Sequence, residues 1–484
     1  MVDKKKIDEL FRGVGKFIDP DDIFRKKLET SPEKIVIKFG VDPTRPDIHL
    51  GHAVVLHKLR QFQDLGCKVI FLVGDFTGSI GDPTGKSKVR PEIDNKIMVE
   101  NVNTYISQIP KILKIEPITS AEKNVNIVRD SNNFVVDSPW FGWMRNNEWF
   151  QSVDDITTEG ASSEALKFKI EEGNEISVPI NSFIAKAVLY ENTRLQKVFL
   201  KRKDIKNVSF INILSALRKI SFSQLIERDM FQERIKKGEP LFMHEMLYPV
   251  IQGIDSEVIS EIYGSCDLEV GGTDQIFNML MGRKVMEMVK SDKREIQAVL
   301  AFKLLEGTDG KEKMSKSLDN YIGVTDEPSD MCGKVMSIPD SSIINYFELC
   351  TTIPMDEIED MQKKLKEKAV NPKDLKMRLA FEIVKIYHGE KKAKEAEENF
   401  VKTFQKKEIP DEMEEIKAEV GEMLSEILVK NKVLSSKGEW RRLVLENAIH
   451  DLGNDTNITD VNLKVSENLT LKIGKKRFVK ILTN

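Results

Sequence analysis

Between residues 35 and 73 the chain alternates short apolar runs with one helical pattern. Residues 35–40 are β-rich, and residues 69–73 form a fully apolar run. Between these runs, residues 49–64 carry apolar side chains at helical spacing. A strand, a helix and a second strand in this order predict a β–α–β unit, which begins a parallel sheet.

The pattern changes three times further along the chain. Residues 151–207 are irregular and rich in loop-forming residues, and we expect them to be an insertion on the core. Residues 356–430 have helical spacing and many charges, which is typical of solvated helix faces. Beyond residue 434, a short helix over residues 437–448 precedes two alternating segments. This order predicts a small α+β module at the C-terminus.

Composition narrows the class of protein. The chain has 484 residues, of which 40% are hydrophobic, enough for a catalytic core and smaller domains. Its formal net charge is −4 although 31% of the residues are charged, so a nucleic-acid surface must be a local patch. Residues 431–484 hold ten Lys and Arg against six Asp and Glu, a net charge of +4. By composition alone, this patch fits a plain solvated surface as well as an RNA-binding one.

The N-terminus and the cysteines indicate the compartment. The first residues lack the apolar run of a secretory signal, and no stretch is long and apolar enough to span a bilayer. Cys67, Cys266, Cys332 and Cys350 lie far apart and form neither a CxxC pair nor a zinc-type set. We therefore expect a reduced, cytoplasmic enzyme with no structural metal and no membrane segment.

Two histidines lie at the start of the helix predicted after the first strand. His49 and His52 are three residues apart, which places both imidazoles on one face of the first turn. A helix N-terminus favours a polyphosphate, and Gly51 lets a nucleotide lie against the backbone. The histidines can donate hydrogen bonds to phosphate oxygens as charge builds in a transition state. A metal pair or two surface histidines are the alternatives, but no metal-ligand spacing surrounds these residues.

Two glycine-containing loops carry further polar side chains. In one, Lys313 and Lys316 can neutralise a departing pyrophosphate, although most lysine-rich loops are simply solvated. The other, residues 74–87, superficially suggests a P-loop, but Ile80 stands where the Walker pattern needs a glycine. Its glycines more plausibly let the loop approach a substrate and present Asp82 to the site.

The two phosphate-handling motifs together carry a resemblance. HLGH at residues 49–52 and an intact KMSKS at residues 313–317 resemble the two hallmarks of class I aminoacyl-tRNA synthetases. Residues 42–52 resemble the DPTxPDxHLGH motif of bacterial tyrosyl-tRNA synthetases, and the likeness extends over nearly the whole chain. It implies an α/β fold: a Rossmann-type parallel-sheet catalytic domain with a helical insertion, then an α-helical domain and a small α+β S4-like domain. The implied boundaries are 1–33 for an N-terminal helical segment, 34–325 for the catalytic domain with a connective insertion at about 151–240, 326–430 for the α-helical domain and 431–484 for the S4-like RNA-binding domain.

The resemblance also implies tyrosine–tRNA ligase activity. Such an enzyme activates L-tyrosine with ATP and Mg²⁺ to tyrosyl-adenylate and pyrophosphate, then transfers tyrosine to the 3′-terminal adenosine of tRNA(Tyr). The alternatives are a tryptophanyl-type synthetase and a catalytically inactive RNA-binding paralogue, and the intact motifs argue against the latter. The implied catalytic residues are His49, His52, Lys313 and Lys316, helped by Lys86 and Arg90 in the loop after the second strand.

Tyrosine selection is implied by an array on a later helix. Tyr248, Gln252 and Asp255 are spaced by four and three residues, which places them on one helix face. In the family's roles, Tyr248, Gln252 and Asp82 hold the substrate ammonium, and Asp255 accepts a hydrogen bond from the phenol. Phenylalanine would leave this buried carboxylate incomplete and be rejected. Without the flanking motifs, a surface acid would be the better interpretation of Asp255.

The ATP site is implied by a second glycine motif. Residues 271–275, GGTDQ, resemble the family's GG[ST]DQ loop, in which Asp274 accepts hydrogen bonds from the ribose hydroxyls. A lone GGTD is more often a glycine turn with a capping Asp. The implied ATP-binding residues are Gly40, Asp42, Thr44, Gly51, Gly271, Asp274, Gln275, Met314, Ser315 and Ser317.

Two positions depart from the family pattern. Lys38 stands where many members have a tyrosine that contacts the phenol, so Lys38 is the side chain expected at that contact. Ile254 replaces an expected aromatic residue. We align the insertion over residues 151–207 with no segment of the family pattern.

RNA binding and assembly are further implications of the resemblance. The C-terminal module resembles the S4-type RNA-binding domain of tyrosyl enzymes, and family members work as homodimers with one tRNA crossing both subunits. The implied tRNA-binding residues are Arg441, Arg442, Lys475, Lys476 and Arg477.

Overall fold

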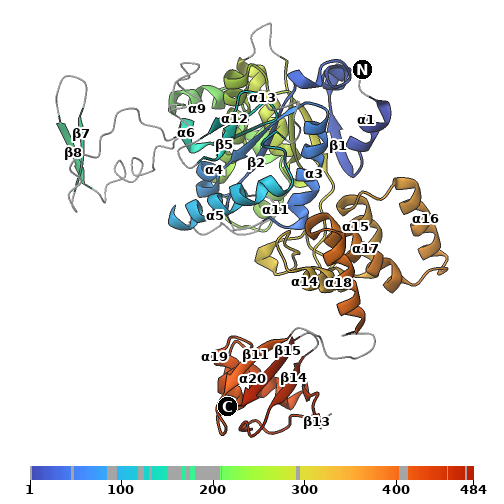
Figure 1. Ribbon diagram of the computed structural model, residues 1–484. Helices are drawn as coiled ribbons and strands as arrows, with labels where there is room; N and C mark the ends of the chain where they lie inside the picture. The colour runs from blue at the N-terminus through green and yellow to red at the C-terminus, as the bar shows by residue number, and fades with distance from the viewer. Residues whose placement is uncertain are drawn as a thin grey trace. The chain divides into compact units, whose positions relative to one another are not determined.

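The computed structural model describes most of the chain and divides it into two compact units (Figure 1). The first unit comprises Met1–Asp326 and Ser337–Leu379, and the second comprises Glu327–Met336 and Ala380–Asn484. The residues described are 3–44, 48–83, 95–117, 125–129, 133–150, 165–169, 175–179, 208, 210–289, 295–402, 413–454, 456–474 and 477–483.

The described part of the first unit is built on an eight-stranded sheet. The five central strands are parallel to one another, whereas β1 pairs antiparallel with β10 and β5 pairs antiparallel with β6. In spatial order the strands are β1 (Val14–Ile18), β10 (Ala298–Phe302), β9 (Leu268–Gly272), β2 (Val36–Val41), β3 (Lys68–Val73), β6 (Phe141–Arg145), β5 (Val135–Asp137) and β4 (Val128–Arg129). The strand–helix–strand prediction for residues 35–73 is confirmed, because β2 and β3 pair in parallel on either side of α3 in the chain.

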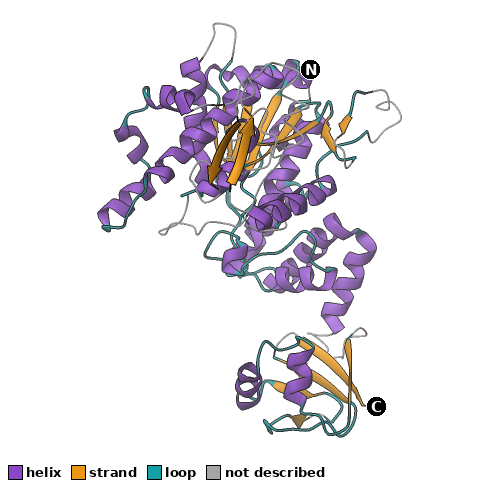
Figure 2. Cartoon of the chain, turned by 90° about the vertical axis from the view of Figure 1, so that its left-hand side faces the viewer, coloured by secondary structure: helices purple, strands orange, loops and turns teal. Residues whose placement is uncertain are grey.

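Helices cover both faces of this sheet, as Figure 2 shows. The helices within the first unit are α1 (Lys4–Leu10), α2 (Ile23–Thr30), α3 (Leu50–Asp64), α4 (Asp75–Ile80), α5 (Asn95–Gln108), α6 (Asn147–Phe150), α9 (Phe210–Leu217), α10 (Phe222–Ile226), α11 (Asp229–Lys236), α12 (Met243–Tyr263), α13 (Ile276–Val289), α15 (Ile343–Cys350) and α16 (Met355–Lys366). Helix α17 (Pro372–His388) contains the boundary between the units.

Helices α12 and α13 pack closely because each has a glycine at the contact. A Cβ atom added to Gly253 would lie 3.1 Å from the carbonyl oxygen of Met281. A Cβ added to Gly282 would lie 2.8 Å from Oε2 of Glu269 on β9. Real Cβ atoms avoid such distances, so a larger residue at Gly253 would push α12 and α13 apart, and one at Gly282 would push α13 away from β9.

The N-terminal segment differs from its prediction. Residues 1–33 were expected to be helical, but residues 14–18 form β1, which pairs antiparallel with β10. The boundary expected at residue 325 also differs from the contact pattern, which assigns Ser337–Leu379 to the first unit. One physical reason is Arg12, whose guanidinium donates to the carbonyl oxygens of Phe347, Glu348 and Ile353.

The C-terminal module begins earlier than residue 431. Strand β11 pairs in parallel with β15, and Leu424, Ile427 and Leu428 of α19 join the module's core. Both elements therefore belong to this module rather than to an α-helical domain ending at residue 430. The module consists of β11 (Glu414–Ala418), α19 (Leu424–Lys430), α20 (Lys437–Leu445), β12 (Ile449–Asp451), β13 (Thr456–Asn457), β14 (Leu469–Ile473) and β15 (Arg477–Thr483), with sheet order β11-β15-β14-β12-β13. The other helices assigned wholly to the second unit are α14 (Pro328–Met336) and α18 (Glu390–Phe400).

Most of the predicted insertion over residues 151–207 lies outside the described residues. Within it, β7 (Ala165–Lys169) pairs antiparallel with β8 (Glu175–Pro179). Elsewhere, no helix in the described ranges is long and apolar enough to cross a membrane.

The core of the C-terminal module makes its stability testable. Trp440 is fully buried, and its Nε1 donates to the carbonyl oxygen of Val461 (2.8 Å). We expect Trp440→Ala to lower the free energy of unfolding of the module by about 3–5 kcal/mol, because it leaves a cavity and an unpaired carbonyl. Hydrogen exchange of the full chain checks this: the amides of β14 should exchange faster, and those of β3 should not. Leu445→Ala on the same helix is the control, because Leu445 is 78% exposed; equal exchange of β14 in both variants would contradict the prediction.

Candidate active site

The candidate site lies where the central parallel strands end. Strands β9, β2 and β3 are neighbours, and polar or glycine residues follow the carboxyl end of each. The order along the sheet reverses at β2, and this reversal opens a crevice in parallel α/β folds. A Cβ atom added to Gly40, near the end of β2, would meet no atom within 4 Å. Ligand atoms can therefore approach the backbone here.

The two predicted histidines stack at the start of α3. Their ring centroids are 3.9 Å apart, and the backbone N–H of His49 donates to Nδ1 of His52 (3.4 Å). Burial, assisted by the nearby Lys316 and Lys313, lowers the pKa of His52 to about 4. Burial likewise lowers the pKa of His49 well below its ordinary value. Both imidazoles are thus neutral at pH 7, and each can donate one N–H to a phosphate oxygen.

The lysine loop, residues 313–317, lies near the two histidines, although it comes more than 250 residues later in the chain. Nζ of Lys313 lies 2.7 Å from Oδ2 of Asp274, which follows β9. Nζ of Lys316 lies 5.1 Å from the ring centre of Tyr321. The backbone N–H of Ser315 donates to Asn320 (2.8 Å), which helps to hold the loop's shape. The structure therefore brings together both phosphate-handling motifs and the expected ribose acceptor.

A strand contact ties the lysine loop to the histidine tract. His49 forms a β-bridge with Gly323, and the N–H of Leu50 donates to the carbonyl oxygen of Ile322 (2.9 Å). Met314 is buried, and its Cβ would lie 3.6 Å from a Cβ atom added to Gly51. A side chain at residue 51 would also meet the His49 imidazole at 3.0 Å. Gly51 thus allows the histidine and the lysine loop to approach each other.

Hydrogen bonds join a residue that is expected to bind ATP to residues that are expected to bind tyrosine. Asp42, near the end of β2, accepts from Tyr248 Oη and from Thr77 Oγ1, both at 2.8 Å. Asn146 donates to Thr77 Oγ1 (3.1 Å) and to Oδ2 of Asp255 (3.3 Å). One network therefore holds a predicted ATP residue and two predicted tyrosine residues, and its rigidity preorganises the pocket.

Asp255 is buried, unlike a helix-surface acid. Its Oδ1 accepts from the indole Nε1 of Trp149 (2.9 Å). Burial raises the pKa of Asp255 to about 7, against the opposing effects of the Lys38 ammonium and of the hydrogen bonds from Asn146 and Trp149. A carboxylate in this state is poised to gain from one more hydroxyl donor.

Asp82 lies beside the glycine-rich ribose loop. Its Oδ2 accepts from Nε2 of Gln275 (2.7 Å), and its Oδ1 lies 3.7 Å from the guanidinium of Arg228. Arg228 also lies over the rings of Phe231 and Phe277. The arrangement puts a positive charge beside Asp82, an expected tyrosine ligand, which also accepts a hydrogen bond from Gln275, an expected ATP ligand.

Lys38 is not placed as predicted. It is fully buried behind α12, where its ammonium contacts Gln252 O (2.8 Å), Ser256 Oγ (2.8 Å) and Glu269 Oε1 (2.9 Å). An ammonium has three donors, and these three oxygens occupy them. The expectation that Lys38 touches the substrate is corrected accordingly.

Several site residues escaped the sequence reasoning. Asn146 and Trp149 follow the end of β6, and polar residues after a strand end were a usable signal for Asn146. Glu269 lies inside β9 and Arg228 lies between two short helices, where no sequence motif marked them. Lys86 and Arg90 lie outside the described residues, and the side chain of Ser317 is not described.

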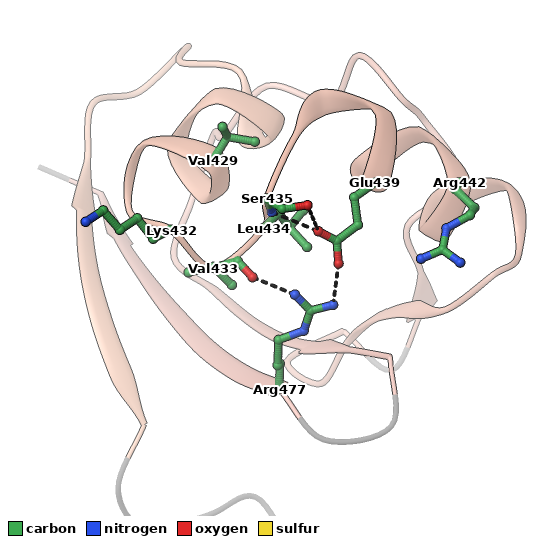
Figure 3. Close-up of a pocket in the computed structure, with 8 residues that line it drawn as sticks. All are labelled: Val429, Lys432, Val433, Leu434, Ser435, Glu439, Arg442 and Arg477. Carbon is green, nitrogen blue, oxygen red and sulfur yellow. Dashed lines mark hydrogen bonds and ion pairs between the residues drawn. The ribbon is translucent and has the colours of Figure 1, made fainter. Parts of the chain in front are cut away.

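The expected tRNA-binding residues of the C-terminal module have different surroundings (Figure 3). Arg477 donates to the Val433 carbonyl oxygen (2.6 Å) and to Oε1 of Glu439 (2.7 Å). This hydrogen bond, with those from Ser435, lowers the pKa of the Glu439 carboxyl to about 2. Arg477 thus stabilises the module's own loop, while the exposed Arg442 lines the same hollow. Lys475 and Lys476 lie outside the described residues.

The site has no preformed metal cluster in the part of the chain that the structure describes, where no three His, Cys, Asp or Glu side chains are grouped to hold a metal ion.

Comparison with known folds gives the architecture a precedent. A tyrosyl-tRNA synthetase of Aspergillus nidulans mitochondria, C-terminally truncated, aligns with a TM-score of 0.54 at 19% identity, over 83% of this chain and 95% of that one. The enzyme of Archaeoglobus fulgidus, solved with L-tyrosine, aligns with a TM-score of 0.51 at 17% identity, over 82% and 100%. At these identities the likeness establishes the fold.

Sequence comparison establishes the family. Residues 30–405 match the family described as tRNA synthetases class I (W and Y). The tyrosine–tRNA ligase of Thermotoga maritima is 36% identical over 99% of this chain and 98% of its own length. Tyrosine–tRNA ligase 2 of Clostridium acetobutylicum is 37% identical over 99% of each chain. The chain therefore belongs to the class I tRNA synthetases and, within them, to the tyrosine–tRNA ligases.

Proposed function

We propose that this chain activates L-tyrosine with Mg-ATP and transfers it to tRNA(Tyr) at the site described above. The observation that carries the proposal is the meeting of the stacked His49–His52 pair, the Lys313–Lys316 loop and Asp274 at one edge of the sheet. In the first step the tyrosine carboxylate attacks the α-phosphorus of ATP, and pyrophosphate leaves. A terminal ribose hydroxyl of the tRNA then attacks the acyl carbon, and AMP leaves.

Catalysis in this proposal is positioning and charge stabilisation, without a covalent enzyme nucleophile. The neutral His49 and His52 donate hydrogen bonds to phosphate oxygens, while Lys313 and Lys316 neutralise the leaving pyrophosphate. Mg²⁺ enters with ATP as part of the substrate. Lys313 would exchange its contact with Asp274 for the phosphates, which frees the Asp274 carboxylate for the ribose hydroxyls.

Tyrosine recognition centres on Asp255 in the buried network. Its neighbours Trp149 and Asn146 already donate to it, and the phenol hydroxyl would add a further donor. Phenylalanine would place apolar atoms against the same carboxylate. The carboxylate would then lose hydration without gaining a hydrogen bond. Tyr248, Gln252 and Asp82 are proposed to bind the substrate ammonium.

Partners beyond the two small substrates are also proposals. The basic C-terminal module, with Arg441 and Arg442 exposed on α20, is proposed to contact phosphates of tRNA(Tyr). A homodimer and a cytoplasmic location are proposed by analogy with the family. Sedimentation of the purified chain at micromolar concentration tests the dimer, and a monomer mass would refute it.

The reaction is tested by ATP–pyrophosphate exchange. We expect exchange with tyrosine, and a loss of about 10²–10³-fold in kcat for His52→Ala and for Lys316→Ala, because each removes a donor to the transition-state charge. Lys311→Ala is the matched control, an exposed lysine of the same loop whose loss should change kcat less than twofold, since solvated lysines contribute little. Exchange that depends on tryptophan would overturn the proposed substrate, and full activity of either active-site variant would remove that residue's role.

The pKa of Asp255 predicts a pH dependence. For the unliganded protein, kcat/KM for tyrosine should fall as the pH drops below about 7, approaching about tenfold per pH unit, because protonation removes the charge that the phenol binds. His52, with a pKa of about 4, stays neutral through this range.

Asp255→Asn supplies the comparison for that pH profile. The variant should lose the decline near pH 7 and favour tyrosine over phenylalanine about 10–100-fold less than the wild type, the value of one hydrogen bond to a charge. The decline and the preference are both measured by exchange at graded tyrosine concentrations. A decline that persists in Asp255→Asn would assign it to another group.

A further inference from the structure

A buried charged cluster lies directly behind the proposed tyrosine-binding face of α12. Lys38 on β2 and Glu269 on β9 have almost no exposed surface, and their charged atoms are 2.9 Å apart. Glu269 also accepts from Gln252 Nε2 (3.0 Å), Ser256 Oγ (3.3 Å) and Gln297 Nε2 (2.5 Å). Every member of this cluster has hydrogen-bond partners inside the cluster.

Both ends of Gln252 are tied to the pair. Its backbone carbonyl oxygen accepts from the Lys38 ammonium (2.8 Å), and its side-chain carboxamide donates to Glu269 (3.0 Å). A carboxamide that donates to Glu269 presents its oxygen in a fixed direction. A substrate ammonium needs such an oxygen as its acceptor. The pair therefore controls both the backbone and the side chain of a residue proposed to bind tyrosine.

Side chains of the cluster lie close against the backbone of α13. A Cβ atom on Gly282 of α13 would lie 2.6 Å from Gln297 Nε2 and 2.8 Å from Glu269 Oε2. A buried ion pair of this kind is a poor source of stability, because desolvation offsets the attraction, whereas losing one partner leaves an uncompensated charge. Its position behind α12 points to a role in orienting the substrate-binding residues.

We infer that Lys38 and Glu269 form a positioning pair that sets the affinity for tyrosine from behind α12, without contact with the substrate. The inference rests on the proposed function. It follows from the contacts of Lys38, which has all three donors occupied while it holds the backbone of Gln252.

The same lysine also acts on Asp255. The charged groups that act on this carboxylate are Lys38 from β2 and Glu269 from β9, with neutral donors from Trp149 and Asn146. The Lys38 ammonium favours the ionised form of Asp255 and Glu269 disfavours it. A neutral residue at position 38 would therefore move the pH profile for tyrosine to higher pH.

The first experiment measures the Michaelis constants of Lys38→Met in ATP–pyrophosphate exchange. We expect KM for tyrosine to rise about tenfold or more, the effect of losing a charge-assisted hydrogen bond, with KM for ATP within about twofold of the wild type. The acid decline of kcat/KM for tyrosine should also move to higher pH. A KM for tyrosine that does not change, or an equal rise for ATP, would overturn the inference.

The second experiment removes both charges together. In Lys38→Met/Glu269→Gln the amide oxygen of the new glutamine can still accept from Gln252, and no charge is left unpaired. We expect KM for tyrosine to stay raised about as much as in Lys38→Met, because both variants lack the Lys38 hydrogen bond to the Gln252 backbone, whereas the double variant has no uncompensated carboxylate. This double variant also decides the case if Lys38→Met does not fold. A folded double variant with the wild-type KM for tyrosine would overturn the inference, because the pair would then be dispensable for affinity. A double variant that does not fold would also overturn it, because the pair would then serve folding.

Lys58→Met is the matched control for a buried lysine. Lys58 on α3 is buried, and its ammonium donates to the carbonyl oxygen of Glu9 (2.6 Å). Its replacement should lower the melting temperature and leave KM for tyrosine unchanged. A rise in KM for tyrosine as large as in Lys38→Met would show a general packing effect and refute the inference. Wild-type protein without any tyrosine-dependent exchange would refute the proposed function instead.

Discussion

The packing of α12 across strands β2 and β9 is the constraint on which the rest of the site depends. Gly253 lets α12 pack closely on α13, and Gly282 lets α13 pack closely on Glu269 of β9. With this packing, the polar residues of α12 meet Lys38 and Glu269 rather than water. Burial makes unpaired polar groups costly, and the hydrogen bonds to Lys38 and Glu269 fix the direction of Gln252.

Burial also shifts the pKa values of the site. It lowers those of the two histidines and raises that of Asp255. On the phosphate side it keeps His49 and His52 neutral, with the nearby lysines adding to the effect. On the tyrosine side it raises the pKa of Asp255 towards neutrality, while Lys38 opposes it. Neutral donors and a carboxylate short of one partner suit a polyphosphate and a phenol, respectively. Hydrogen bonds through Asp42, Thr77 and Asn146 connect the end of β2 to Tyr248 and Asp255 on α12.

In the C-terminal module, too, a charged side chain is held by hydrogen bonds within the protein. Arg477 belongs to a conspicuous basic run, yet its hydrogen bonds hold the Val433 carbonyl and Glu439 within the module. Its positive charge therefore counts less towards a phosphate-binding surface than the net charge of the segment indicates. The arginines exposed on α20 are better placed to meet an external partner.

The sequence by itself determined the reaction class and the local elements that carry it. The β2–α3–β3 unit, the histidine pair at the helix start and the lysine loop are each defined by residues close together in the chain, where spacing and periodicity are informative. Only the tertiary structure decided the surroundings of these residues. Trp149 and Asp255 are 106 positions apart, Lys38 and Gln252 are 214 apart, and β11 completes a sheet with β15 from the far end of the module. The chain's local pattern does not encode such pairings directly, because they follow from which helices and strands the core brings together. For that reason the resemblance implied a substrate contact for Lys38, whereas the fold buries Lys38 against Gln252, Ser256 and Glu269.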